Sequence, residues 1–193
     1  MDIFSVLAES FDLPVLDWIA EHLQCAFLDF IMPLITVLGD AGIFWIAAAA
    51  LLMLFPKYRK AGLSMGIALM IGLLVCNVTL KPLVQRIRPY DYQLEHFGVQ
   101  IKLLIDAQHD FSFPSGHTIA SFEAATALLV HNRKLGIPAM ILAVLIAFSR
   151  MYLYVHYPTD VLASVILGVG IAFLGCFLAQ KVYDLWASKQ KNA

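Results

Sequence analysis

Residues 61–80 read AGLSMGIALMIGLLVCNVTL and carry no charged side chain. Twenty residues in an α-helix extend for about 30 Å, which is roughly the thickness of the hydrocarbon core of a bilayer. Lys81 follows directly and would lie at the membrane surface. The stretch therefore predicts a membrane-spanning helix, and the rest of the chain can be placed relative to it.

The composition of the whole chain supports the same conclusion. Of the 193 residues 61% are apolar, and the mean hydropathy is +0.78. Soluble domains usually contain about 45–50% apolar residues, so an integral membrane protein is indicated. A net charge of -1 without a basic tail argues against a nucleic-acid partner. With no linker and no repeat, we expect a single membrane-embedded domain over residues 1–193.

The apolar runs predict an all-α, polytopic bundle of six transmembrane helices, preceded by an amphipathic, interfacial helical segment at residues 4–23. Pro33 interrupts the first run. If that run only dips into the membrane, the N-terminus changes sides, but the side of the later polar segments does not change. The six runs are 23–38, 43–55, 61–80, 115–130, 135–148 and 161–180.

Basic residues give the orientation. Eight of the 13 lysines and arginines lie in the 57–60 loop, the 131–134 loop and the polar tail after residue 180. Cytoplasmic loops carry an excess of such residues. We therefore expect these loops and both termini in the cytoplasm, and Lys81, the polar 82–113 loop and the 149–160 segment on the outer surface.

Three cations are predicted at that outer surface, namely Lys81, Arg88 and Arg150. An arginine can bind two phosphoryl oxygens at once, and a lysine supplies a point charge. Ser115 and Gly116 begin the fourth predicted span, where free backbone amides form a seat for an anion. Together these five residues predict a site for a phosphate group.

Two histidines and a carboxylate in the same segments suggest that the phosphate is cleaved. A neutral imidazole can attack phosphorus, and a protonated one can give its proton to the leaving alkoxide. Asp160 lies four residues after His156 and can orient it, as the carboxylate of a catalytic triad does. We assign His156 as nucleophile and His117 as general acid, although the spacing alone allows the reverse.

These residues form three complete motifs in order. The first is Lys, six residues and Arg-Pro (81–89), and the second is Pro-Ser-Gly-His (114–117). The third is Ser-Arg, five residues, His, three residues and Asp (149–160). The pattern resembles the type 2 phosphatidic acid phosphatase superfamily. The resemblance implies a six-helix membrane fold and metal-independent hydrolysis of lipid phosphates, without a cofactor, on the outer side of the bacterial plasma membrane. It also implies the roles assigned above, with phosphate held by Lys81, Arg88, Ser115, Gly116 and Arg150.

Bacterial members act on undecaprenyl diphosphate, phosphatidylglycerol phosphate or phosphatidic acid, and we expect the first because the predicted active face is outward. Two other classes of function remain open: a transporter or binding protein that does not cleave the lipid phosphate, and a phosphotransferase that passes the phosphoryl group to an acceptor. Glu123 lies within a predicted span, where carboxylates are costly, and is expected to line a polar cleft or to pair with another helix. Tyr92, Tyr152, Tyr154 and Tyr157 are expected in an interfacial aromatic belt.

Overall fold

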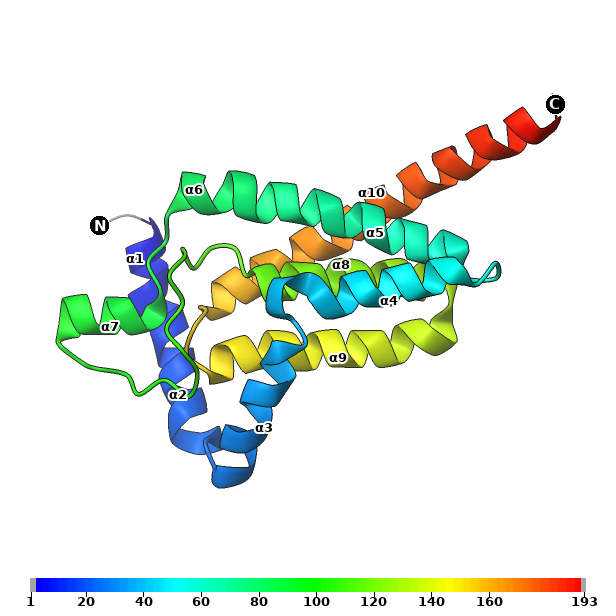
Figure 1. Ribbon diagram of the computed structural model, residues 1–193. Helices are drawn as coiled ribbons and strands as arrows, with labels where there is room; N and C mark the ends of the chain where they lie inside the picture. Colours follow the sequence, from blue (N-terminus) through cyan, green and yellow to red (C-terminus); the bar gives the residue numbers. More distant parts are fainter. Residues whose placement is uncertain (1–2, 192–193) are drawn as a thin grey trace.

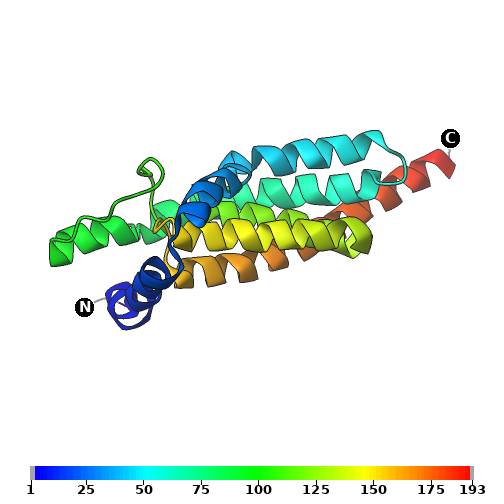
Figure 2. The ribbon, with the colours of Figure 1, turned by 90° about the horizontal axis from the view of Figure 1, so that it is seen from below.

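The computed structural model describes residues 3–191, with side chains described for residues 3–185. Helices and the turns between them make up this part of the chain, and no strand occurs in it. The long helices lie side by side in one bundle, as Figures 1 and 2 show from two directions. They are α4 (Ile43–Leu54), α5 (Arg59–Leu73), α8 (Gly116–His131), α9 (Arg133–Tyr152) and α10 (Pro158–Lys191).

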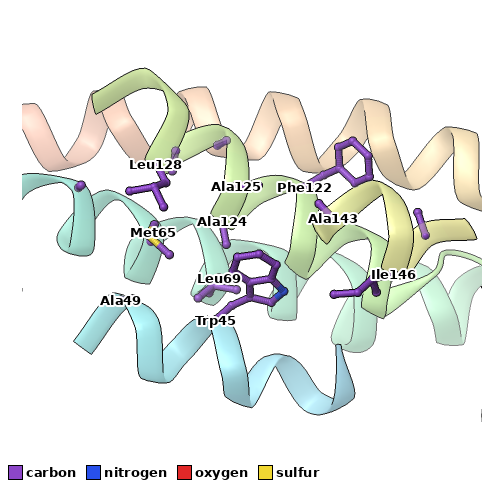
Figure 3. Packing of buried hydrophobic residues seen from close by; sticks show 14 of the residues in the cluster. Trp45, Ala49, Met65, Leu69, Phe122, Ala124, Ala125, Leu128, Ala143 and Ile146 are labelled. Atoms are coloured by element: carbon purple, nitrogen blue, oxygen red, sulfur yellow. The ribbon is translucent and has the colours of Figure 1, made fainter. Parts of the chain in front are cut away.

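Helix α8 lies at the centre of the bundle. It packs against α5, α9 and α10, while α4 packs against α5. Its small residues Ala124, Ala125 and Ala127 are fully buried and let the neighbouring helices approach closely. Figure 3 shows the large side chain of Trp45 among them, and its indole N–H donates to the Ser121 hydroxyl at 3.0 Å. Close packing against three helices explains why α8 carries small and polar residues between its buried Ile119, Phe122 and Leu128.

The outer surface of the bundle is covered by large apolar side chains. Met70 is 66% exposed and Ile166 is 73% exposed. Side chains of this kind on several neighbouring helices are typical of a surface that faces lipid rather than water. Others in this group are Ile46, Leu54, Leu73, Ile141, Val144 and Phe173.

Six full crossings are not confirmed. By length and composition, three helical segments of the described chain could cross a membrane: Arg59–Phe97, Arg133–Tyr152 and Pro158–Leu185. A fourth is possible if Ala26–Val37 and Asp40–Leu54, which are bent by 41°, form one broken span. Helices α3 (Ala26–Val37) and α4 have 12 residues each, or about 18 Å, too short for either to cross a core of about 30 Å alone.

The N-terminal segment is helical, as predicted, and lies across one end of the bundle. It consists of α1 (Ile3–Leu7), η1 (Ala8–Asp12) and α2 (Leu13–Leu23), and α2 buries Leu13, Leu16 and Ile19. Asp17 accepts a hydrogen bond from Tyr154 at 2.6 Å, and Asp29 of α3 accepts one from Tyr152 at 2.6 Å. These contacts place both segments at the end of the bundle that holds the 149–160 motif.

This position corrects the predicted arrangement of the termini. The described chain begins at one end of the bundle and finishes at the other, as Figure 1 shows. The expectation that both termini lie on one side is therefore wrong, and the alternative in which residues 23–38 do not cross is the one that fits. Helix α10 also continues through the predicted polar tail to Lys191, although the side chains of Lys189 and Lys191 lie outside the described set.

The predicted spanning helix at 61–80 forms α5 and then η3 (Leu74–Leu80), a π-helical stretch. Stretches of this kind often occur next to functional sites. The short α6 (Lys81–Val84) follows, and the polar segment after it is not a continuous loop, because it contains α7 (Pro89–Phe97). Gly98 ends α7 with a positive φ of 67°, which a glycine adopts without strain.

Candidate active site

The three motifs meet at the end of the bundle that the N-terminal helices cover. Lys81 begins α6, Arg88 precedes α7, and Arg150 lies in the last turn of α9. These cations line one cavity of about 630 Å³ together with Gly116, His117 and His156. The remaining two predicted site residues are fully buried beside lining residues, because Ser115 precedes Gly116 in the chain and Asp160 Oδ2 lies 3.7 Å from His156 Nδ1. The structure thus brings together all eight predicted residues.

His156 lies in the turn between α9 and α10 and is 1% exposed. Its Nε2 accepts a contact from Arg88 Nη1 at 3.4 Å, whereas its Nδ1 lies 3.7 Å from Asp160 Oδ2 and has no hydrogen-bond partner. Burial, followed by the positive charges of Arg88 and Arg150, holds the pKa of His156 well below its usual 6.5. The imidazole is therefore neutral at physiological pH, and its Nε2 lone pair points toward Arg88 in the wall of the cavity.

Asp160 faces His156 but does not form the predicted hydrogen bond to it. Its oxygens instead accept from Arg86 Nη1 at 2.5 Å, from the Ser112 hydroxyl at 2.5 Å and from the Tyr157 amide at 3.2 Å. The Ser112 amide also donates to the Arg86 carbonyl at 2.7 Å. The carboxylate is fixed by these donors and lies within reach of the imidazole.

Arg86 is the centre of a network that the sequence did not reveal. Its Nη2 donates to Asp12 Oδ2 at 2.7 Å, and its guanidinium lies 3.7 Å from the centre of the Tyr157 ring. Asp12 also accepts from the backbone amide of Thr159 at 2.9 Å and from its hydroxyl at 2.7 Å. The side chains of Asp12, Arg86 and Asp160 are at most 3% exposed. Arg86 is thus held by carboxylates and does not line the cavity.

Lys81 and Arg88 share one carboxylate, that of Asp110 in the loop before α8. Asp110 Oδ2 pairs with Lys81 Nζ, and Oδ1 pairs with Arg88 Nη2. Arg88 also donates from Nε to the Asp110 carbonyl at 2.9 Å and from Nη1 to the Val155 carbonyl at 2.7 Å. Burial alone would raise the pKa of Asp110, but Lys81 and Arg88 outweigh it and lower the pKa to about 2. The Asp110 carboxylate therefore neutralises part of the charge of both cations.

Arg150 is the third cation and keeps an unused donor. It is 1% exposed and donates from Nη1 to the Thr36 hydroxyl of α3 at 2.6 Å. Its Nε is buried without a hydrogen-bond partner. A buried, unsatisfied guanidinium donor in the wall of a cavity is suited to an anionic oxygen.

Gly116, the first residue of α8, lines the cavity, but Ser115 does not cap the helix with its side chain. The Ser115 amide donates to the Ser164 hydroxyl at 2.9 Å, and its own hydroxyl accepts from Thr118 at 2.9 Å. A Cβ on Gly116 would only come into ordinary contact with Asn77, at 3.7 Å. The packing of the protein does not require a glycine at position 116, so the space beside Gly116 is open to a ligand.

His117 lies on the α4 side of the cavity. Its Nε2 lies 2.7 Å from Oδ1 of Asp40, in the bend between α3 and α4. A Cβ on Gly39 would lie only 2.6 Å from the His117 ring, so the bend approaches the imidazole closely. The sequence identified residues 39–42 only as a turn, and the carboxylate that contacts the second histidine was therefore missed.

The cavity continues from the charged groups into an apolar groove between α4 and α5. Its walls there are formed by small and flexible apolar side chains, which suits a hydrocarbon chain. They include Ile46, Ala49, Ala50 and Met53 of α4 and Gly66, Leu69, Met70 and Leu73 of α5. One continuous space thus joins an anion site to an apolar groove.

The tyrosines do not form the predicted aromatic belt. Tyr152, Tyr154 and Tyr157 are buried beneath the N-terminal helices, and the hydroxyl of Tyr92 donates to Glu9 at 2.7 Å. They anchor the acidic N-terminal segment to the site rather than the protein to the lipid surface. Among the residues that the structure describes, no group of three or more histidine, cysteine or acidic side chains could hold a metal ion.

Comparisons with known proteins agree with this geometry. A family model described as the PAP2 superfamily matches residues 57–183, which include all three motifs. The chain is 37% identical over 131 residues to an undecaprenyl-diphosphatase of Sulfolobus acidocaldarius, an alignment that covers 67% of this chain and 61% of that protein. It is 35% identical over 147 residues to undecaprenyl-diphosphatase BcrC of Bacillus subtilis, covering 76% and 72%.

A solved structure extends the similarity to nearly the whole fold. The crystal structure of a transmembrane PAP2-type phosphatidylglycerolphosphate phosphatase from Bacillus subtilis matches with a TM-score of 0.71 and 27% identity. The match covers 93% of each chain. The N-terminal helices and the bundle therefore both have counterparts in a known membrane protein.

Proposed function

Because the chain belongs to the PAP2 superfamily, we propose that it is a membrane phosphatase that hydrolyses a lipid phosphate or diphosphate. The observation that carries the proposal is the single cavity lined by two histidines, three cations and an apolar groove. A protein that only binds or transports the lipid would need the cations and the groove but no second histidine as proton donor. Undecaprenyl diphosphate is the first candidate substrate, because two relatives carry that name.

In the proposed mechanism, Nε2 of His156 attacks phosphorus, and the bond from phosphorus to the leaving oxygen breaks. His117 gives its proton to that oxygen and afterwards takes a proton from the water that attacks the phospho-histidine. The second step releases inorganic phosphate and restores both imidazoles. Support for this assignment comes from the orientation of His156, whose Nε2 faces the cations while Nδ1 faces Asp160.

The cations and the helix start serve charge stabilisation in this mechanism. Arg88, Arg150 and Lys81 would hold the equatorial oxygens of the phosphoryl group. The first backbone amides of α8, beginning with that of Gly116, would add neutral donors. Asp160 acts as a positioning residue, because it touches the imidazole and not the substrate. Asp110 would have to leave Lys81 and Arg88 when phosphate enters.

The test is phosphate release from polyprenyl diphosphate, phosphatidylglycerol phosphate and phosphatidic acid by the protein in mild detergent. Release should persist in excess EDTA, because no metal takes part in the proposed steps. His156→Ala should reduce release to background, and brief incubation with labelled substrate should no longer label the protein. His22→Ala, which removes an exposed histidine that does not line the cavity, is the matched control. Full turnover by His156→Ala would refute the nucleophile assignment.

Phosphotransfer is tested in the same assay by adding an acceptor alcohol. A phosphorylated acceptor formed faster than free phosphate would favour a transferase over a hydrolase. Binding without any release of phosphate would favour the non-catalytic alternative.

We also propose that the cavity end faces outward from a bacterial plasma membrane and that the C-terminal end of α10 lies in the cytoplasm. Basic residues of the 57–60 loop and at 133–134 lie at the end away from the cavity, which supports this orientation. Cys25 tests it, because its side chain is exposed at the cavity end whereas Cys76 is buried. A membrane-impermeant thiol reagent should label Cys25 in intact cells, and Cys25→Ser should lose this labelling. Labelling only after cell lysis would reverse the orientation.

A further inference from the structure

Glu123 is a buried carboxyl group without a partner. It lies on α8 about two turns after His117, is 1% exposed and lines the cavity. Its Oε2 has no hydrogen-bond partner, and none of the described cations forms a salt bridge with it. Glu123 is thus a polar group in the apolar part of the cavity that the protein itself does not satisfy.

Gly72 of α5 makes room for this carboxyl group. A Cβ at position 72 would lie 2.1 Å from Glu123 Oε2 and 2.5 Å from Oε1, so no larger residue fits while the carboxyl keeps its position. The expected pairing of Glu123 with another helix is therefore not found. The other expectation, that it lines a polar cleft, is met in part, because Glu123 lines the cavity but lies in its apolar part.

An isolated charge in an apolar groove is strongly disfavoured, so the carboxyl group is expected in its neutral form. A neutral carboxyl has one O–H donor. Because this donor has no acceptor in the protein, it is available to an oxygen atom of a ligand in the groove. A hydrogen-bond acceptor, and not a cation, is the complementary group.

The depth of Glu123 limits which ligand atom can reach it. Six residues separate it from His117, which corresponds to about 9 Å along α8, and glutamate side chains lean toward the start of their helix. A lipid whose phosphate lies at His156 places its next few bonds at this level. In a glycerolipid phosphate these bonds lead to the ester carbonyl groups, whereas in a polyprenyl diphosphate they lead through the inner phosphate to hydrocarbon, which carries no acceptor.

We propose that the Glu123 carboxyl donates a hydrogen bond to an ester carbonyl oxygen of a diacylglycerol phosphate bound in the cavity. The inference rests on the proposed lipid phosphatase function and adds to it a residue that distinguishes ester-linked lipids from other lipid phosphates. Glu123 is a specificity-determining residue in this view. It acts on the lipid backbone, at a distance from the phosphorus atom.

The experiment compares dioctanoyl phosphatidic acid with its dioctyl ether analogue, which lacks both carbonyl oxygens. The wild-type protein should prefer the ester in kcat/KM by about five- to tenfold, the factor that one hydrogen bond supplies. Glu123→Leu should bring the ratio close to one, and Glu123→Gln, which keeps an N–H donor of similar shape, should retain most of it. Val130→Ala, at a half-exposed position of α8 outside the cavity, is the matched control.

The same ratio is measured as binding affinity for the two lipids on the His156→Ala background. This second readout separates the two proposals, because an ester preference in binding can be detected even if no phosphate is released from any lipid. The inference is overturned if Glu123→Leu lowers binding and turnover of ester and ether lipids equally. It is also overturned if the wild-type protein does not distinguish the two lipids.

Discussion

Removal of the Asp12 carboxylate should destabilise the protein and disturb the site, although Asp12 lies 144 residues before His156 in the chain. Asp12 is fully buried and accepts hydrogen bonds from the guanidinium of Arg86 and from the amide and hydroxyl of Thr159. Breaking a buried ion pair by removing one partner costs about 3–5 kcal/mol. We expect Asp12→Ala to lower the free energy of unfolding by about that amount.

Asp17→Ala is the matched control, because Asp17 lies on the neighbouring helix α2 and accepts one hydrogen bond from the neutral Tyr154 hydroxyl. Loss of one hydrogen bond to a carboxylate costs about 1.5–3 kcal/mol. Denaturant unfolding in mild detergent measures both variants. Asp12→Ala should lose about 2 kcal/mol more than Asp17→Ala, which is the difference between the middles of the two ranges.

Turnover provides the second measurement. Without Asp12, the Arg86 guanidinium keeps side-chain hydrogen bonds only to Asp160 and Thr159, and a shift of Asp160 changes the position of His156. Displacement of a catalytic group by about 1 Å can cost roughly 100-fold in rate, so kcat should fall by about 10- to 100-fold with a smaller change in KM. The reasoning is refuted if Asp12→Ala costs no more stability than Asp17→Ala and retains full kcat.

Three further predictions follow from single contacts in the site. Asp110→Asn removes the carboxylate that pairs with Lys81 and Arg88, so inhibition by inorganic phosphate should become stronger. We expect about a fivefold lower inhibition constant, because a half-exposed ion pair contributes about 1 kcal/mol. Weaker inhibition would contradict this reasoning. Asp40→Asn should lower kcat toward the kcat of His117→Ala, with a smaller change in KM. An unchanged kcat would show that Asp40 does not position His117. Because the pKa of His156 is held well below 6.5, the nucleophile stays unprotonated at pH 6.5, and kcat/KM should not fall as the pH falls through that value. For the same reason the unfolded state binds an extra proton below about pH 6.5, so stability should fall as the pH falls through that value, and His156→Gln should reduce this slope.

Local sequence patterns predicted much of the fold and most of the site. Apolar runs located the bundle helices to within a few residues, because burial in lipid leaves a continuous signal, except that α10 continues to Lys191, well past the predicted end at residue 180. The motif residues could be grouped because each follows or precedes a predicted span, which places it at a helix end. Lys81, His117 and Arg150 line one cavity for this reason.

Contacts between distant segments could not be predicted in this way. Asp12 and Asp40 look like ordinary interfacial and turn carboxylates, and only the tertiary fold places them against Arg86 and His117. The buried tyrosines were misassigned for the same reason. The position of the N-terminus could have been anticipated from residues 23–38, where 16 residues with Asp29 and Pro33 are too few and too polar for a full crossing.

The Asp12–Arg86–Asp160 network also limits the order in which the protein can be assembled during synthesis. Arg86 is separated by 74 residues from each of its two carboxylate partners. Its second partner emerges from the ribosome only after more than four fifths of the chain has been made. Until then the nascent chain has neither the closing carboxylate nor His156 in place, so the phosphatase can become active only after its last helix has begun to insert.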